Sequence, residues 1–238
     1  MKALITACSL LLLSGCANLD QMPWAGFTAN SSCSKPSADQ ELSLNLADEM
    51  ANDGKLHASL ANLQNMPDSL PQVRLRKAKV YRLLGRNEAE PLYKTLLGTC
   101  LSAEGEHGLG QLAVARGDNA KATAHLQRAA TLSPTDEKIR NDLGVVYLNQ
   151  LRMDEARFEF LTAMELNQSN PLAAINLVTL LIYQGNWGQA SQVVGRMGLS
   201  PDQVTQAQAR AQQLKGSPAS PSKAQMAAVS EALQAPIQ

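Results

Sequence analysis

Residues 141–156 read NDLGVVYLNQLRMDEA, and this stretch decides the fold. Its apolar residues recur at spacings of three and four, which places them on one face of a helix, whereas a strand would alternate every second residue. The segment LRMDEA at its end is typical of a short turn that leads into another helix. The stretch therefore predicts two consecutive helices that pack against each other.

The same pattern recurs every 34 residues through the middle of the chain. Three sets of residues share a repeat position: Leu109-Gly110, Leu143-Gly144 and Leu177-Val178; Ala122, Ala156 and Ala190; Leu126, Phe160 and Val194. The small residues at Gly110 and Gly144 would let the second helix of each pair approach the first closely. Gly117 and Gly185 mark the turn between the helices, where the middle copy has Leu151.

A 34-residue unit of this kind resembles the tetratricopeptide repeat (TPR), which consists of two antiparallel helices. The resemblance implies an all-α protein, a right-handed TPR superhelix of about five helical hairpins plus a capping helix. The composition agrees, because hydrophobic residues make up 45% of the chain and aromatic residues only 4%, a balance that favours Ala/Leu-rich helix packing. The usual proline at the end of a repeat is kept at Pro134 but replaced by Gln168 and Asp202.

The sequence divides into segments around these repeats. Residues 39–100 are expected to form divergent, shortened hairpins, residues 101–199 three TPR repeats, and residues 200–215 a capping helix. Residues 216–238 begin with the linker GSPASPS, and Met226, Val229 and Leu233 then follow at helical spacing. This last segment is expected to be either a short C-terminal helix or a disordered tail.

The N-terminus predicts a lipoprotein signal peptide over residues 1–15. Lys2 precedes a mostly apolar run that is too short to span a bilayer, and Leu13-Ser14-Gly15-Cys16 resembles the lipobox of bacterial lipoproteins. The resemblance implies that Cys16 is acylated and that residues 16–38 form a lipidated tether. The next residue is Ala17, not the Asp that retains enteric lipoproteins at the inner membrane, which implies an outer-membrane protein facing the periplasm. The alternative is an ordinary signal peptide with a chance cysteine.

Cys33 and Cys100 are the two thiols that remain once Cys8 leaves with the signal peptide and Cys16 is acylated. In an oxidising periplasm such a pair is a disulfide candidate. The alternative is two free, partly buried thiols.

The sequence contains no pattern that predicts catalysis. The formal net charge is zero and there is no basic run, which argues against nucleic-acid binding. The three histidines lie in different hairpins with no metal-ligand spacing, and neither a phosphate-binding loop nor a nucleophile elbow is found. We therefore expect a non-enzyme with no cofactor, no metal and no small-molecule substrate.

The expected function is the binding of a protein partner. In stacked hairpins, the first helix of each repeat lines a concave groove that can hold a partner helix or an extended peptide. By register, the groove is predicted to include His107, Gln111, Lys138, Asn141, Val145, Leu148, Leu172, Ile175, Thr179 and Ile182. The last of these are unusually apolar for an open face, so the capping helix or the C-terminal stripe could instead cover them.

A lipobox, a short tether and about five hairpins resemble the TadD group of TPR lipoproteins of the tight-adherence (Flp pilus) apparatus. The block that begins LGQLAVARGDNAKATAHLQRAATLSPTDEKIRNDLG carries the resemblance, which covers residues 100–215 well. It implies help for secretin or pilus assembly at the outer membrane, with a secretin or another pilus-assembly component as partner. The alternatives are a type IV pilus pilotin, and a periplasmic adaptor that binds or regulates a cell-wall enzyme.

Overall fold

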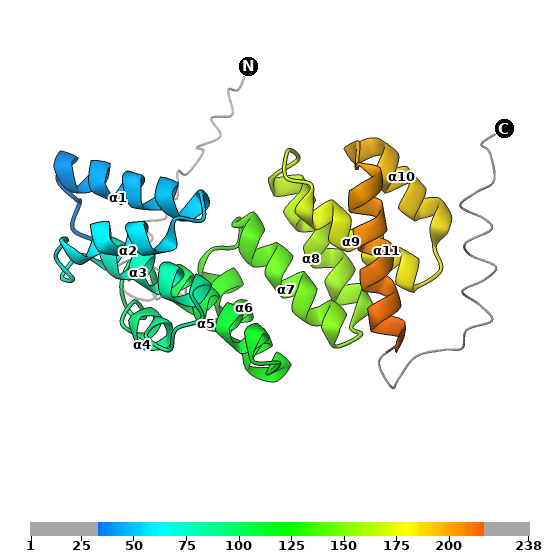
Figure 1. Ribbon diagram of the computed structural model, residues 1–238. Helices are drawn as coiled ribbons and strands as arrows, with labels where there is room; N and C mark the ends of the chain where they lie inside the picture. Colours follow the sequence, from blue (N-terminus) through cyan, green and yellow to red (C-terminus); the bar gives the residue numbers. More distant parts are fainter. Residues whose placement is uncertain (1–32, 217–238) are drawn as a thin grey trace, which may run out of the picture. The chain divides into compact units, whose positions relative to one another are not determined.

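The computed structural model describes residues 33–216. Within that range it contains eleven α-helices and no strand (Figure 1). The helices are α1 (Ala38–Asn52), α2 (Leu56–Gln64), α3 (Pro71–Leu83), α4 (Ala89–Lys94), α5 (Ser102–Ala115), α6 (Asn119–Leu132), α7 (Glu137–Asn149), α8 (Met153–Leu166), α9 (Leu172–Tyr183), α10 (Trp187–Met197) and α11 (Pro201–Gly216). The predicted all-α class is confirmed. The predicted signal peptide, the tether up to residue 32 and the C-terminal segment from residue 217 lie outside the described residues.

Consecutive helices pack as hairpins, and each hairpin packs on the next. The pairs are α1 with α2, α3 with α4, α5 with α6, α7 with α8, and α9 with α10, while α11 packs on α9. The largest apolar core extends from α5 to α11, and two smaller clusters hold the first two hairpins together. Because one hairpin cannot bury its apolar face alone, this stacking provides the core of the protein.

Glycines allow the two helices of each central hairpin to approach. A Cβ atom at Gly144 would lie 2.6 Å from Cε1 of Phe160, and one at Gly110 would lie 2.7 Å from Cγ of Leu126. Phe160 and Leu126 are fully buried. The close approach predicted at these two repeat positions is therefore present, with the apolar side chain of the second helix lying directly on the glycine.

The first two hairpins are shortened in their second helices. α2 has 9 residues and α4 has 6, compared with 14 in both α6 and α8. The chain after α4 continues as turns up to α5, and the buried side chains of Tyr93 on α4 and Leu96 after it share a small apolar cluster with Leu109 of α5. A Cβ atom at Gly108 would overlap the Tyr93 ring, so this glycine is also required by packing.

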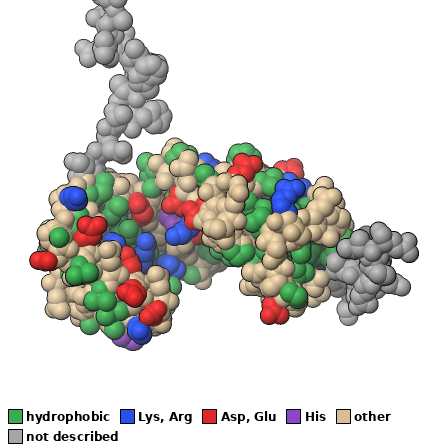
Figure 2. All heavy atoms as spheres, turned by 90° about the horizontal axis from the view of Figure 1, so that it is seen from above, with side chains coloured by type: hydrophobic (Ala, Val, Ile, Leu, Met, Phe, Trp, Pro, Cys, Tyr) green, Lys and Arg blue, Asp and Glu red, His purple; other side chains and the backbone are tan. Residues whose placement is uncertain are grey.

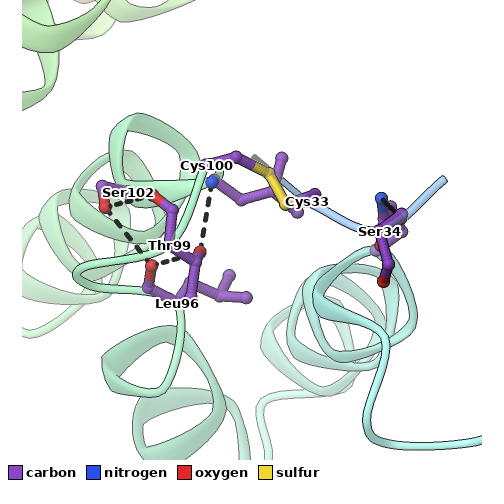
Figure 3. The surroundings of a disulfide bond; sticks show 8 residues. Cys33, Ser34, Leu96, Thr99, Cys100 and Ser102 are labelled. Atoms are coloured by element: carbon purple, nitrogen blue, oxygen red, sulfur yellow. Dashed lines mark hydrogen bonds between the residues drawn. A yellow bond between two sulfur atoms is a disulfide. The ribbon is translucent and has the colours of Figure 1, made fainter. Parts of the chain in front are cut away.

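A disulfide joins Cys33 to Cys100 across a sequence separation of 67 residues, with the two Cα atoms 5.5 Å apart. Cys100 lies in the turn between α4 and α5, which is held by hydrogen bonds from the Thr99 and Ser102 hydroxyls to the Leu96 carbonyl at 2.6 and 3.4 Å (Figure 3). One residue after Cys33, the carbonyl of Ser34 accepts a hydrogen bond from Gln72 Nε2 at 3.2 Å. The bridge therefore ties the segment that precedes α1 to the beginning of α5.

Candidate functional site

The apolar end of the predicted groove is closed. Leu148, Ile175, Thr179 and Ile182 are all buried, because they belong to the packed core around α9 and because α11 lies against α9 (Figure 1). Lys215 fixes α11 there by donating from Nζ to the Ile182 carbonyl at 3.3 Å. The prediction that these four residues line an open groove is wrong, and the covering helix is the capping helix itself.

The polar part of the predicted groove remains open. A pocket of about 260 Å³ is formed between α5, α7 and the beginning of α9. Figure 2 shows positive and negative side chains gathered with a histidine where the surface is hollowed. The pocket, called the polar groove below, is lined by His107, Gln111, Glu137, Lys138, Asn141, Asp142, Ala163, Asn167, Asn170, Leu172 and Ala173. The structure thus brings together five of the predicted residues, namely His107, Gln111, Lys138, Asn141 and Leu172.

Asp142 is the centre of the polar groove. Its Oδ2 lies 2.7 Å from His107 Nε2 and accepts a hydrogen bond from Gln111 Nε2, also at 2.7 Å. Its Oδ1 accepts from Asn141 Nδ2 at 3.2 Å, and Asn141 Oδ1 in turn accepts from Asn176 Nδ2 at 2.8 Å. These bonds connect α5, α7 and α9 and hold the groove-lining side chains in fixed orientations.

The surroundings of Asp142 change the pKa of its carboxyl group. Burial alone would raise the pKa of Asp142, but the hydrogen bond and charge of His107, together with the hydrogen bonds from Gln111 and Asn141, outweigh burial and lower this pKa. Asp142 is therefore ionised at neutral pH, with its charge already satisfied within the groove.

A second pocket of about 250 Å³ adjoins the first. The two pockets share Gln111 and Asp142, and the second is also lined by Arg82, Val114 and Val145. Val145, one of the predicted groove residues, thus lies in this second pocket. Together the pockets offer a partner a continuous path along the first helices of four hairpins, α3, α5, α7 and α9.

Several polar groups of the groove are available to a partner. Gln111 Oε1, Asn170 Nδ2 and Lys138 Nζ have no hydrogen-bond or ion-pair partner among residues 33–216. An amide oxygen, an amide nitrogen and an ammonium group can pair with the main chain or with polar side chains of a bound segment. Leu172, which is 48% exposed at the edge of the groove, provides an apolar contact.

Repeat register alone did not identify Asp142, Asn170 and Asn176 as part of this site. Asp142 follows Asn141 directly, and the register assigned only Asn141 to the groove. The signal that could have found it is the spacing of Asp142 from His107 and Gln111, 35 and 31 residues, which places all three on adjacent first helices.

The described residues contain neither a metal site nor a membrane-spanning helix. No group of three or more His, Cys, Asp or Glu side chains in residues 33–216 is placed to hold a metal ion. No helix in the same range is long and apolar enough to cross a bilayer.

The stacked hairpins and the groove along their first helices define a TPR-class helical-repeat protein, whose function is to bind other proteins. The chain is 42% identical over 213 residues to the TPR repeat-containing protein PA4299 of Pseudomonas aeruginosa, a match that covers 89% of this chain and 85% of that protein. The chain therefore belongs to the family of TPR repeat-containing proteins that includes PA4299. No protein-family model matches it.

Solved TPR structures share the fold at low sequence identity. The structure described as Pseudomonas aeruginosa pilF matches with a TM-score of 0.58 at 17% identity, over 74% of this chain and 88% of that chain. TTC0263, a thermophilic TPR protein of Thermus thermophilus, matches with a TM-score of 0.54 at 20% identity, over 71% of this chain and 97% of that chain. These matches confirm the predicted TPR fold. TPR repeat proteins generally act as non-enzymatic scaffolds, and this chain is a scaffold for protein–protein interaction.

Proposed function

We propose that this protein is a lipid-anchored scaffold of the outer membrane that binds a secretin or another pilus-assembly protein during Flp (tight-adherence) pilus biogenesis. The polar groove carries the binding part of this proposal. It combines unpaired hydrogen-bonding groups on Gln111, Lys138 and Asn170 with a side-chain network that is already ordered around Asp142. A preorganised groove needs little further ordering when a segment binds, which favours affinity.

The location and the pilus role rest on the sequence. The lipobox that ends at Cys16 supports a lipid anchor, and Ala17 supports the outer membrane. Several acyl chains on one cysteine make anchoring effectively permanent. Substitution of Cys16 by Ser should therefore move the protein from the outer-membrane fraction to the soluble periplasmic fraction, and an unchanged distribution would overturn the anchor.

The test of the groove is a crosslinking pull-down from outer membranes. The groove variant is Lys138→Glu with Leu172→Glu, both at exposed positions of the polar groove. Its matched control is Lys121→Glu with Leu132→Glu on α6, which makes the same changes at positions exposed by 75% and 55%. Neither variant alters a buried residue, so both should fold.

We expect the wild type and the α6 control to capture a secretin or another pilus-assembly component, and the groove variant to lose it. Equal capture by both variants would show that the partner binds elsewhere on the protein. Capture of a cell-wall synthase or hydrolase through the groove would leave the scaffold assignment standing and overturn the pilus assignment.

A further inference from the structure

A groove whose lining residues are half apolar and half polar lies between the second helices of the last two hairpins. It has a volume of about 380 Å³ and is lined by Leu161, Met164, Glu165, Gln168, Arg196 and Met197, and it is called the α8–α10 groove below. Leu161 is 44% exposed, and Phe158, one helical turn before it on α8, is 62% exposed. Single exposed apolar side chains are common on proteins, but a cluster of them beside a groove indicates an interaction site.

The apolar character of this surface is specific to the fourth hairpin. One repeat earlier, the positions of Phe158 and Leu161 hold Ala124 and Gln127, and one repeat later they hold Gln192 and Gly195. Gln127 is used in packing, because it donates to the Tyr147 hydroxyl at 2.9 Å. The general TPR pattern therefore does not account for Phe158 and Leu161.

The chain itself carries a segment that matches this groove. Met226, Val229 and Leu233 follow one another at helical spacing in KAQMAAVSEAL, residues 223–233. In a helix these three side chains form one narrow apolar stripe, while Ala224 lies on the opposite side. The stripe thus offers three apolar side chains to a groove that itself has three, Leu161, Met164 and Met197.

The end of the described chain places this segment within reach. Lys215 donates to the Ile182 carbonyl and lies over the Tyr183 ring, 6.0 Å from its centroid, so α11 ends beside the turn between α9 and α10. Arg157 of α8 reaches the same region by donating to Gln184 and Gln189 at 2.6 and 3.2 Å. The six linker residues SPASPS that follow α11 can extend to about 21 Å, whereas the 11 residues of α10 rise only about 16 Å.

We propose that residues 223–233 dock in the α8–α10 groove of the same molecule, with Met226, Val229 and Leu233 covering Leu161, Met164 and Met197. The docked segment would shield the apolar surface of the fourth hairpin from water. The polar groove lies on the first helices and stays open, so this proposal is independent of the partner proposed above.

The first test is photocrosslinking of the purified full-length protein. A benzoylphenylalanine in place of Leu161 should form a crosslink to a residue within 223–233, located by mass spectrometry. The same group in place of the exposed Leu132 on α6 is the control and should not reach that segment. Mixing isotope-labelled and unlabelled protein separates a link within one molecule from a link between two copies.

The second test changes the docking segment. Val229→Glu places a charge in the apolar contact and should reduce the crosslink yield about tenfold. Ala224→Glu adds the same charge on the opposite side of the segment and should leave the yield unchanged. Both residues follow α11 in the sequence, and helical content and unfolding midpoint serve as checks that the variants remain folded.

Three results would overturn the proposal. The first is a crosslink from position 161 that joins labelled to unlabelled chains, which would make the groove an interface between copies. The second is a crosslink to residues other than 223–233. The third is equal yield in the Val229→Glu and Ala224→Glu variants.

Discussion

Leu151 adopts a left-handed backbone conformation, with a φ of 59°. It occupies the turn position at which the neighbouring repeats have Gly117 and Gly185, with φ angles of 74° and 77°. A side chain in this region costs about 1–2 kcal/mol through the close approach of Cβ to the backbone. The turn geometry is therefore kept in the middle repeat at the expense of local strain.

Leu151→Gly should raise the free energy of unfolding by roughly 0.5–1 kcal/mol, because the relief of strain exceeds the larger entropy that glycine gives the unfolded chain. Urea unfolding of the two proteins measures this difference. The reciprocal change Gly117→Leu should lower stability by about 1–2 kcal/mol. A lower midpoint for Leu151→Gly would show that the contacts of this half-exposed leucine outweigh its strain.

The repeat pattern in the sequence predicted the contacts of some residues and missed those of others. The close contacts of Gly110 and Gly144 followed from their period, because a small residue that recurs at one fixed offset indicates a close approach of two helices. The contact between Gly108 and Tyr93 was not predicted, since Tyr93 belongs to a shortened hairpin that does not keep the period. Asp142 was missed although its spacing from His107 and Gln111 is close to the repeat period, because its hydrogen bonds to them join two different hairpins.

Two hairpins use the same repeat positions for ion pairs of opposite polarity. In the third hairpin, Glu106 of α5 accepts from Arg128 Nε at 2.8 Å and lies 2.6 Å from His125 Nδ1. In the fourth, Arg140 and Glu159 take the positions of Glu106 and His125, with 3.1 Å between Arg140 Nη1 and Glu159 Oε2. The acid thus lies on the first helix in one hairpin and on the second helix in the other.

The two buried acids should respond to pH in opposite directions. Burial alone would raise the pKa of Glu106, but Arg128 and His125 outweigh burial and lower it. For Glu159, burial raises the pKa and Arg140 opposes this only in part. Stability from Glu106 is therefore present above its unfolded pKa and lost as the pH falls through its lower folded pKa. Glu159 instead becomes unfavourable as the pH rises from its unfolded pKa to its higher folded pKa.

Urea unfolding of Glu106→Gln and Glu159→Gln at several values between about pH 3 and pH 7 measures these effects. Relative to the wild type, Glu106→Gln should become less stable as the pH rises. Over the same range, Glu159→Gln should become more stable relative to the wild type. Slopes of the same sign for the two variants would contradict the assigned pKa directions.

The disulfide stabilises the first two hairpins as a unit. It closes a loop across a separation of 67 residues, for which the chain-entropy model gives about 4 kcal/mol. Cys33→Ser with Cys100→Ser should lower the free energy of unfolding by about 2–4 kcal/mol. A reductant should destabilise the wild type by a similar amount and leave the double variant unchanged. Equal stability of the variant and the oxidised wild type would contradict this role.

Across the whole molecule, the sequence predicted the hairpins better than their contacts with distant segments. Helix spacing and the 34-residue period are local signals, and the structure contains α5 to α10 as three hairpins in the predicted region. The position of α11 depends on which side of α9 it covers, which no local pattern specifies. For this reason the sequence left open whether Ile175, Thr179 and Ile182 face a partner or are covered by the capping helix, and the structure shows them buried with α11 packed on α9.

The covering of α9 by α11 leads to the last prediction. Ala211 of α11 is fully buried, whereas Ala209 on the same helix is exposed. Ala211→Glu places a charge at a buried position of α11, which would cost several kcal/mol if α11 stayed in place. We therefore expect α11 to detach, which would expose Ile175 and Ile182, increase the binding of an apolar dye and lower the unfolding midpoint.

Ala209→Glu makes the same substitution two residues away on the solvent side of α11. Its stability should lie within about 0.5 kcal/mol of the wild type, and its dye binding should not change. The difference between the two variants isolates the contact of α11 with α9 from any effect of the charge on the helix itself. If Ala211→Glu were as stable as Ala209→Glu, α11 would not be the element that covers α9, and Ile175 and Ile182 would again be candidates for partner contact.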